Sequence, residues 1–473
     1  MTFLSRICAT ACAAMACLVM GSCFSDSDSD NTPTSGHCAI TTAALGNLTR
    51  TVYVKNSNGV DTSYQVALAG AAYPLYIDQL RQEIYNPDSL PMNTHVDKVL
   101  FSAINGDGVI GYITPYGNDT LFNAKDTIDC SGPVIFTCHS SDGNQQKNYR
   151  LTVNVHKMAS EAFTWAKVCE MPDAFAGVSA QKAFLMDSMI VIVGLKNGQP
   201  WWASCPMSDP AAWQSGELAN MNGLDVAGVQ KLGDSLYATA DAGVMVSADG
   251  RTWRNVGGEM EPQHLVGASK DEIYGFRDGK IWNSTDGITW QCDSADSDLA
   301  LFPSQATAST WLQMNFNTAF SYALIGGRIP CDDGTYTPVV WKKTIDSRGN
   351  NTEPWTLYAQ NEGGPNVYPT NEGMVMLDYD EKVYALCLEG DTLSNFYFSS
   401  DAGRNWVEQS STSYLHPRAL QAENFSAVVD SDNYIWIILA PSGTVWRGRL
   451  NRLSFAEHQT IFTKGAAPQM QSK

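Results

Sequence analysis

The chain has 473 residues, of which 44% are hydrophobic, so it can bury a large core and is not a disordered polypeptide. Its formal net charge of −19 argues against nucleic acid as a partner, because no basic surface is available to neutralise phosphates. Every one of the 13 Trp residues lies at or beyond position 165. This shift in composition predicts a domain boundary near residue 158.

Residues 1–22 have the pattern of a signal peptide. Arg6 supplies a positive charge, and residues 7–20 form an apolar run that is too short to cross a bilayer. The run ends at Gly21-Ser22-Cys23, which resembles the bacterial lipobox. That resemblance implies cleavage before Cys23 and diacylation of its thiol, and two acyl chains suffice for stable anchoring. The alternative is an ordinary secretory signal followed by an incidental cysteine.

Residues 23–37 form a polar, acidic tether in which Ser and Asp alternate from Ser25 to Asp30. Such a composition cannot pack into a core, so we expect disorder here. An acidic stretch directly after a lipidated cysteine resembles the surface-export signal of Bacteroides-type lipoproteins. The resemblance implies an outer-membrane protein that is lipid-anchored through Cys23 and exposed at the cell surface.

Residues 38–157 predict a small β domain. Residues 50–55 and 64–68 alternate between apolar and polar, and a turn at Asp142-Gly143 precedes a closing strand at 149–155. This ending resembles the last hairpin of immunoglobulin-like modules, which implies an immunoglobulin-like sandwich. Residues 84–94 contain two prolines and several Asn, Asp and Ser residues, which predict a structured loop or an edge. The segment resembles one that recurs in an uncharacterised family of Bacteroides-type surface lipoproteins, in which such a module precedes a propeller.

Three segments beyond residue 240 repeat a tight turn followed by Trp. In each, the Asp can accept hydrogen bonds from N–H groups two or three residues on, the Gly can adopt a positive φ, and the Ser hydroxyl can bond back to the turn. The Trp can wedge between neighbouring sheets. The residues concerned are Ser247, Asp249, Gly250 and Trp253, then Ser284, Asp286, Gly287 and Trp290, and finally Ser399, Asp401, Gly403 and Trp406.

The repeated turn resembles the Asp-box of sialidase-type propellers. Only the third copy has the full spacing, and it has Asn405 where Thr is usual, whereas the first two copies lack one residue before the Gly. The resemblance implies a structural role at the blade edge, away from the binding face. The alternative is an acid or metal site at these Asp residues.

Strand–turn–strand units of blade length predict an all-β chain with a six-bladed β-propeller over residues 158–458, followed by a tail at 459–473. The long fourth unit contains an apolar run ending in Gly326-Gly327 with Trp341 downstream, which resembles a kelch repeat, and splitting this unit would give seven blades. The sixth unit holds Trp446 but no Asp-box-like turn. We predict that residues 163–168 supply its outer strand, which would remove two exposed sheet edges. The six units lie near 172–216, 223–258, 264–293, 303–358, 367–410 and 418–455.

Eight cysteines remain when the signal peptide and Cys23 are set aside, and none forms a Cys-x-x-Cys pair. Zinc and redox motifs are therefore missing, and no metal or cofactor is predicted. Cys130 and Cys138 could face each other across a hairpin and form a disulfide in an oxidising compartment. Scattered buried thiols are the alternative interpretation.

No catalytic residue is predicted, because the chain contains no Gly-x-Ser-x-Gly, His-Glu-x-x-His or phosphate-binding loop. Arg328-Ile329-Pro330 resembles the Arg-Ile-Pro element of sialidases. That element precedes the first Asp-box in sialidases but follows two of the turns here, so we interpret the match as a coincidence.

The predicted function is that of a non-catalytic surface lipoprotein whose propeller binds glycan or protein through its loop face. A sialidase-type glycoside hydrolase is the alternative. The flat rings of Trp201 and Trp202 are candidates for sugar stacking, with Trp311 a weaker one, but for each single Trp the core of a blade is the favoured interpretation.

Overall fold

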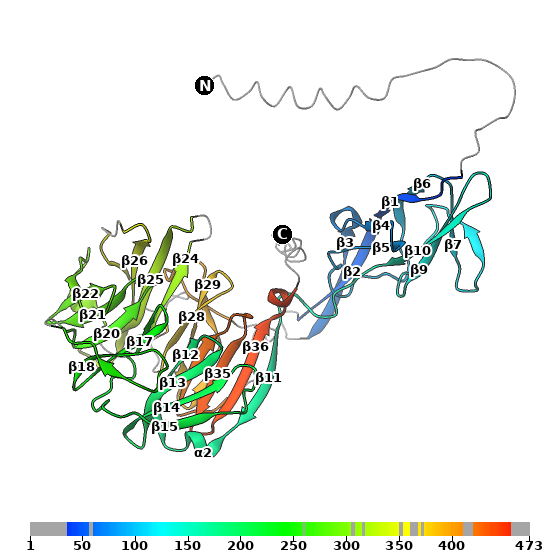
Figure 1. Cartoon of the computed structure of the whole chain (residues 1–473). Coiled ribbons are helices and arrows are strands. Elements are labelled where there is room, and N and C mark those ends of the chain that lie inside the picture. Colours follow the sequence, from blue (N-terminus) through cyan, green and yellow to red (C-terminus); the bar gives the residue numbers. More distant parts are fainter. Residues whose placement is uncertain are drawn as a thin grey trace, which may run out of the picture. The chain divides into compact units, whose positions relative to one another are not determined.

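The computed structural model describes residues 36–55, 60–258, 261–303, 308–314, 317–349, 353–359, 368–369, 373–409 and 420–455. These residues form two compact units, one of residues 36–90 and 94–154 and one of residues 91–93 and 155–455. The chain is almost entirely β (Figure 1). In the described part, no helix has the length and apolarity that crossing a membrane requires. The predicted signal peptide, Cys23 and the tail at 459–473 lie outside the described residues.

The first unit is built on one six-stranded sheet of order β4-β5-β10-β9-β7-β8, in which β5 and β10 run parallel and the other pairs are antiparallel. Two antiparallel ribbons, β1–β6 and β2–β3, accompany it. Phe101 and Phe136 pack edge to face in the core at 5.6 Å. The strands are β1 (Ile40–Leu45), β2 (Asn47–Lys55), β3 (Asp61–Ala69), β4 (Tyr76–Asp78), β5 (Glu83–Tyr85), β6 (Phe101–Gly106), β7 (Val109–Ile113), β8 (Asp119–Leu121), β9 (Val134–His139) and β10 (Gln146–Thr152), with a short 3-10 helix, η1, at Gly70–Ala72.

A buried asparagine fixes the proline-containing segment that follows β5. Asn86 is fully buried, and its side chain donates to the carbonyls of Asp88 at 2.7 Å and Asn154 at 2.9 Å. Its Oδ1 accepts from the N–H of Asn154 at 2.6 Å. The prediction of a structured loop at this place is therefore confirmed, and the loop is tied to the end of the last strand of its unit.

The second unit is a β-propeller, in which the described residues form six four-stranded antiparallel sheets. Sheet 1 holds β12 (Val178–Met186), β13 (Met189–Lys196), β14 (Gln199–Pro206) and β15 (Gln214–Glu217), and sheet 2 holds β16 (Gln230–Leu232), β17 (Ser235–Ala240), β18 (Gly243–Ser247) and β19 (Arg254–Asn255). Sheet 3 holds β20 (His264–Ala268), β21 (Ile273–Arg277), β22 (Lys280–Ser284) and β23 (Gln291–Cys292).

The fourth predicted unit forms one sheet rather than two, with β24 (Ala308–Gln313), β25 (Phe320–Pro330), β26 (Tyr336–Asp346) and β27 (Thr356–Ala359). Sheet 5 holds β28 (Val375–Tyr379), β29 (Lys382–Leu386), β32 (Tyr397–Ser399) and β33 (Val407–Glu408), with the small ribbon β30 (Leu388–Glu389) and β31 (Thr392–Leu393) inserted. Sheet 6 combines β34 (Asn424–Val429), β35 (Ile435–Ala440) and β36 (Thr444–Leu450) with β11 (Phe163–Glu170). The remaining elements are the helix α2 (Pro172–Phe175) and the 3-10 helices η2 (Leu299–Leu301) and η3 (Asn451–Ser454).

The predicted ring closure is confirmed. Strand β11 pairs antiparallel with β36, from Phe163 opposite Leu450 to Glu170 opposite Thr444. Beyond the strand, Asn451 donates its N–H to Ala162 at 2.9 Å and accepts from the hydroxyl of Thr164 at 2.7 Å. The first strand of the propeller unit is thus the outer strand of its last sheet.

The propeller has two ends that differ in how the chain connects its strands. The first strands of most successive sheets contact one another. Their N-terminal residues meet, since Asn424 of sheet 6 donates to the carbonyl of Val178 of sheet 1 at 2.8 Å, and Ser309 of sheet 4 donates to Gln230 of sheet 2 at 3.1 Å. We call this the loop end, because the chain enters each sheet here. The turns between the third and fourth strands lie at the opposite end, which we call the turn end.

All eight described cysteines are free thiols. Cys138 lies on β9 and Cys130 in the preceding loop, and both are buried. Burial raises the pKa of Cys130 to about 12, so this thiol stays protonated. The structure therefore agrees with the interpretation of scattered thiols and does not contain the Cys130–Cys138 disulfide.

Replacement of Gly448 tests the closing contact. A Cβ at Gly448 would lie 2.1 Å from the ring of Trp165 on β11, so Gly448→Val should push the closing strand away and destabilise the propeller by about 1–3 kcal/mol. Urea unfolding followed by Trp fluorescence reports on the propeller alone, because all Trp residues lie at or beyond 165. Ser215→Val is the control, since it introduces the same side chain at an exposed strand position of the same unit. Equal stability of the two variants would contradict the expectation.

Candidate functional site

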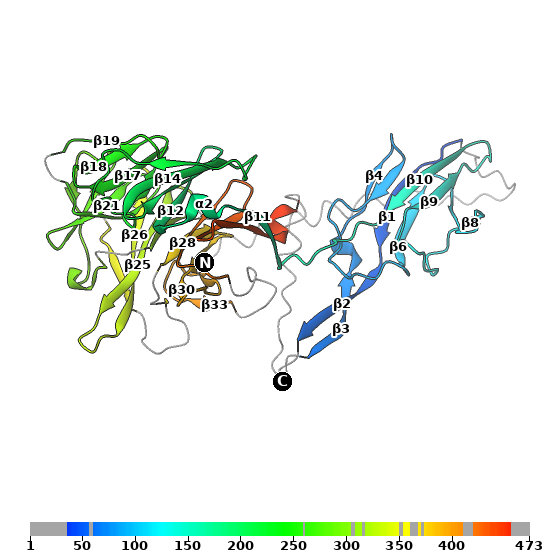
Figure 2. The same ribbon diagram turned by 90° about the horizontal axis from the view of Figure 1, so that it is seen from below.

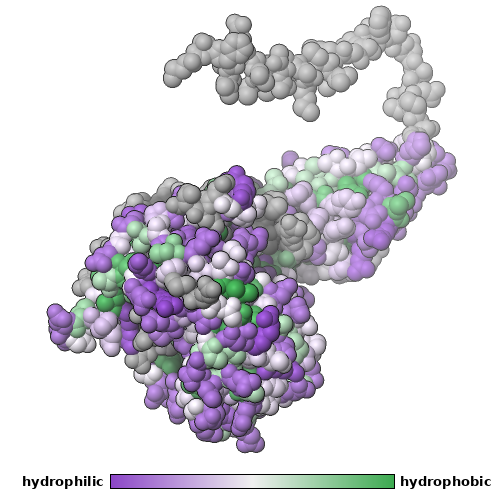
Figure 3. Space-filling view, turned by 60° about the vertical axis from the view of Figure 1, so that its left-hand side comes forward, coloured by the Kyte–Doolittle hydropathy of each residue, from purple (hydrophilic) through white to green (hydrophobic). Residues whose placement is uncertain are grey.

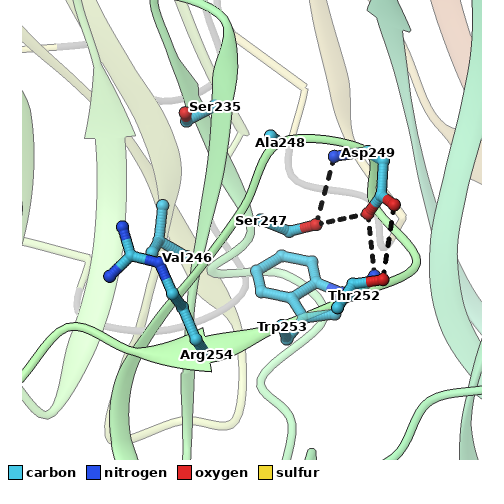
Figure 4. A pocket seen from close by; sticks show the side chains of 8 residues that line it. All are labelled: Ser235, Val246, Ser247, Ala248, Asp249, Thr252, Trp253 and Arg254. Carbon is cyan, nitrogen blue, oxygen red and sulfur yellow. Dashed lines mark hydrogen bonds between the residues drawn. The ribbon is translucent and has the colours of Figure 1, made fainter.

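The three repeated turns are held by their own polar side chains, as predicted. Oδ1 of Asp249 accepts from the N–H groups of Arg251 and Thr252, both at 2.8 Å. Figure 4 shows the bonds of Asp249 to Thr252 and to Ser247. The hydroxyl of Ser247 donates to Asp249 at 3.0 Å and accepts from the N–H of Gly250 at 2.8 Å. Gly250 has a φ of +71°, a conformation that glycine adopts without strain.

The second turn repeats this geometry, and the third adapts it to one extra residue. Asp286 accepts from the N–H groups of Ile288 and Thr289, both at 2.8 Å. Asp401 accepts from the backbone N–H of Asn405 at 2.9 Å and from its side-chain amide at 2.7 Å. Asn405 therefore supplies a side-chain donor to the Asp, so the departure from Thr preserves a bond to the turn.

Each turn also places its Trp between two sheets. The indole of Trp253 donates to the carbonyl of Gly250 at 3.2 Å and packs with Val191 and Val193 of sheet 1 and with Leu236 of sheet 2. Trp290 packs in the same way between sheets 2 and 3, and Trp406 between sheets 4 and 5. The repeated motif therefore joins a hydrogen-bonded turn to the seam between neighbouring sheets.

The carboxylates of the turns are occupied by these bonds. Burial opposes ionisation of Asp249, but the N–H groups of Thr252 and Arg251 and the Ser247 hydroxyl outweigh it and lower its pKa. The turn residues line a hollow of about 310 Å³, and a second hollow of about 480 Å³ lies beside the turn of sheet 3. Among the described residues, no group of three or more His, Cys, Asp or Glu side chains could hold a metal ion.

A second cluster of polar side chains lies toward the loop end. Lys182 on β12 donates to the carbonyl of Ala227 at 3.0 Å, in the loop that leads into sheet 2. In the same loop, Oδ2 of Asp225 lies 3.3 Å from Nδ1 of His264, the first residue of β20. The side chains of Asp225 and His264 are 29% and 34% exposed, so a ligand can reach them.

Burial shifts the pKa of two charged groups on inner strands, Lys182 and Asp378. Burial lowers the pKa of Lys182 to about 8, although the carboxylate of Asp225 limits the fall. Burial raises the pKa of Asp378 on β28 to about 6. Asp378 is nevertheless exposed, so water reaches this residue although partial desolvation raises its pKa.

A long hairpin projects from sheet 4 at the loop end. Ala308, the first residue of β24, pairs with Gly326, so the residues from Gly327 to the tip extend beyond the inner strand. The hairpin of β25 and β26 extends past the neighbouring strands in Figure 2. On it, the guanidinium of Arg328 lies 4.0 Å from the ring centre of Tyr336, which is 45% exposed.

The three Trp residues that were candidates for sugar stacking do not form one common site. Trp201 is 3% exposed and packs edge to face against Phe175, so its ring belongs to the core of the blade. Trp202, beside it on β14, is partly buried under the guanidinium of Arg251 at 4.4 Å. Trp311 is partly exposed on β24 of another sheet.

Sequence reasoning assigned no role in ligand binding to Lys182, Asp225, Lys231, His264 or Tyr336. The cluster joins a strand residue to loop residues more than 40 positions away, and no local pattern signals such a meeting. The projecting hairpin did leave a signal, since the run from 320 to 346 is much longer than the corresponding strands of the other sheets. Lys231 on β16 donates to the carbonyl of Leu185 on β12 at 2.5 Å and so links the inner strands of sheets 1 and 2.

These features define a β-propeller that follows a separate β unit. The chain belongs to the family described as "DUF6242 beta propeller domain", whose model matches residues 159–458. Residues 43–153 match the model described as "Domain of unknown function (DUF6242) N-terminal domain". The predicted combination of an N-terminal module and a propeller in an uncharacterised family is therefore confirmed. No curated protein matches the chain.

The chain is also similar, at low sequence identity, to several solved structures. A Trypanosoma rangeli sialidase in complex with 2,3-difluorosialic acid is 10% identical, with a TM-score of 0.36 over 64% of this chain and 60% of the sialidase. A Trichoderma reesei carbohydrate-active enzyme of family AA12 is 8% identical, with a TM-score of 0.37 over 62% and 97%. A Penicillium chrysogenum α-L-arabinanase complexed with arabinobiose is 10% identical, with a TM-score of 0.29 over 72% and 91%.

Asp249→Ala should lower the free energy of unfolding by about 1–3 kcal/mol, because it removes two backbone partners and the Ser247 partner. The folded-state pKa of Asp249 is lowered, so its contribution is present above the unfolded pKa and is lost as the pH falls through the folded value. Urea unfolding at pH 7 and pH 3 should therefore show a difference between wild type and variant that shrinks at pH 3. Asp332→Ala, which removes an exposed carboxylate on the hairpin, is the control. An equal loss in both variants would contradict a specific role for the turn.

Proposed function

We propose that the chain is a non-catalytic surface lipoprotein whose propeller binds glycan at its loop end. The observation that carries the proposal is the projecting hairpin with its exposed Tyr336. An aromatic ring held rigidly on a strand offers a flat apolar face against which a sugar ring can pack at low entropic cost. Arg328 lies over one face of this ring, which orients it and leaves its other side for a ligand.

Polar groups at the same end support recognition of a hydroxyl-rich ligand. Lys182 can donate hydrogen bonds, Asp225 can accept them, and His264 can do either. Lys182 and His264 stand on two inner strands and Asp225 stands on a loop between sheets, and loops on a rigid scaffold are where binding residues concentrate. In the face shown in Figure 3, hydrophilic residues cover most of the surface and hydrophobic residues form separate patches. This surface favours a polar ligand over a large apolar partner.

The placement of the acidic and basic residues weighs against a sialidase-type hydrolase. The carboxylates that recur along the chain are bound within the turns at the opposite end of the sheets. Arg328 of the Arg-Ile-Pro segment stands on the projecting hairpin and stacks on Tyr336, away from the inner strands. Binding without turnover is therefore the function that this arrangement supports best.

A glycan array probed with the purified chain tests the proposal. Tyr336→Ala should weaken binding to the recognised glycan about tenfold, which corresponds to about 1.4 kcal/mol. Tyr116→Ala is the matched control, because that Tyr is 91% exposed and lies in the other unit. The same chain should leave a panel of fluorogenic glycosides uncleaved. Cleavage of any of these glycosides would favour the hydrolase. Equal glycan binding by the Tyr336→Ala and Tyr116→Ala variants would show that the hairpin is not part of the binding site.

The anchor is a second part of the proposal and concerns residues outside those that the structure describes. Its support is the Gly21-Ser22-Cys23 junction after a short apolar run. Cys23→Ala should abolish acylation and move the chain from the detergent phase to the aqueous phase in detergent partitioning. Cys17→Ala, inside the predicted signal peptide, should leave the partitioning unchanged. Membrane association of the Cys23 variant would refute lipid anchoring.

A further inference from the structure

Two arginines of sheet 6 stack on the same aromatic ring. Arg447 and Arg449 are alternate residues of β36, so their side chains start on the same face of the sheet, about 7 Å apart along the strand. The guanidinium carbon of Arg447 lies 4.4 Å from the ring centre of Tyr434, and that of Arg449 lies 4.2 Å from the same centre. Arg447 also lies 5.0 Å from the ring centre of Trp436. The two guanidiniums are therefore held near each other although they carry the same charge.

The rings under the two arginines are fixed by the turn between β34 and β35. Asp430 is 8% exposed, and its carboxylate accepts from the N–H of Tyr434 at 2.9 Å and from the indole of Trp436 at 2.7 Å. From sheet 5, the hydroxyl of Tyr379 donates to the carbonyl of Asn433 at 3.0 Å. Rings that are already fixed limit the freedom that the stacked arginines would lose when a ligand binds.

Neither guanidinium is neutralised within the described part of the chain. Arg449 donates to the backbone carbonyl of Asp432 at 3.0 Å, but no described carboxylate forms an ion pair with Arg449 or with Arg447. The carboxylate of Asp430 is occupied by the turn. A guanidinium that stacks on a ring keeps its N–H donors at the edge of its plane, where a ligand can accept from them.

The neighbouring strand leaves the arginine pair accessible. Ala166 of β11 pairs with Arg447, and Thr164 pairs with Arg449. Cross-strand partners share a face of the sheet, and these two small residues are exposed. Strand β11 is the outermost strand of sheet 6 and lies beside β36 in Figure 1. Both arginines are partly exposed, so a solute can reach them.

We propose that Arg447 and Arg449 bind a tetrahedral oxyanion, namely the sulfate or phosphate ester group of a small ligand. Each guanidinium can donate two parallel N–H groups to an oxyanion. An ester of sulfate or phosphate has three free oxygens and can accept from both guanidiniums at once. A carboxylate has two oxygens, which one guanidinium already occupies. The bound anion would also offset the repulsion between the two like charges.

The acidity of the chain limits the kind of ligand. The net charge of −19 repels a polyanion or an anionic membrane surface, whereas two arginines suffice for one ester group. The site also differs in place from the glycan site proposed above. Strand β34 starts at the loop end with Asn424, so the turn that follows this strand, with Tyr434, lies at the turn end. The ester site therefore does not rest on the proposed glycan binding.

Titration calorimetry of the full chain carrying Cys23→Ala tests the class of ligand. The probes are glucose 6-sulfate, glucose 6-phosphate and glucuronate at low ionic strength. We expect at least one ester to bind with a Kd below about 1 mM and glucuronate to bind about tenfold more weakly than that ester. The ester that binds more tightly identifies the group. Absence of binding by both esters, or equal binding of glucuronate, overturns the proposal.

Variants that keep the charge test the role of the arginine pair. Arg447→Lys and Arg449→Lys lose the planar pair of donors, so each should weaken binding of the ester about tenfold, while Trp fluorescence confirms that the propeller is folded. Arg254→Lys is the matched control, because Arg254 is exposed on β19 of another sheet. Tyr336→Ala should also leave this affinity unchanged, whatever it does to glycan binding. Unchanged affinity in both β36 variants, or an equal loss in the Arg254 variant, overturns the proposal.

Discussion

The propeller depends on the pairing of β11 with β36. Each sheet of a propeller covers its faces only with its two neighbours, so an open ring would leave two apolar faces exposed at once. The seam that would open joins Ile190 and Ile192 of sheet 1 to Trp436 and Ile438 of sheet 6, all of them fully buried. Because β11 precedes sheet 1 in the chain and completes sheet 6, it ties this seam covalently. Separation of the two sheets therefore requires loss of a whole strand pair.

The repeated turns stabilise one end of the sheets and leave the other end free to vary. At the turn end, Asp and Ser side chains satisfy backbone N–H groups, and Trp fills the seam. Each turn is thus held by short-range contacts that do not involve the loop end. The loops and the long hairpin can then differ from sheet to sheet without weakening the ring, which is the arrangement on which binding proteins with rigid scaffolds rely. Asp225 comes from such a loop, whereas Lys182 and His264 stand on inner strands beside it.

A structural feature could be predicted from the sequence when the residues that form it lie close together along the chain or when the repeats left one strand without a partner. The turn at Asp249 was predictable because all of its bonds join residues within five positions. The closing strand was predictable because the sixth unit lacked an outer strand and one strand was left over. Trp201 and Trp202 could not be assigned from alternation, because both faces of β14 are covered: Trp201 packs toward sheet 6 and Trp202 toward sheet 2. The cluster of Lys182, Asp225 and His264 could be recognised only in the folded structure, because these residues lie about 40 or more positions apart in the sequence.

Sheets that resemble one another raise the question of how each finds its correct neighbour. Between sheets 3 and 4, the ammonium of Lys343 is 1% exposed and bonds to Asp293, with Glu272 at 3.7 Å. Glu272 also accepts from the hydroxyl of Tyr274 at 2.9 Å, and the indole of Trp355 donates to Asp293 at 3.0 Å. A buried pair of this kind adds little net stability, but a buried charge without its partner costs about 3–5 kcal/mol. Sheet 4 packed against any other sheet would bury Lys343 without these carboxylates. The network therefore penalises wrong pairings more strongly than it rewards the right one, which is how a ring of similar units can keep a single order.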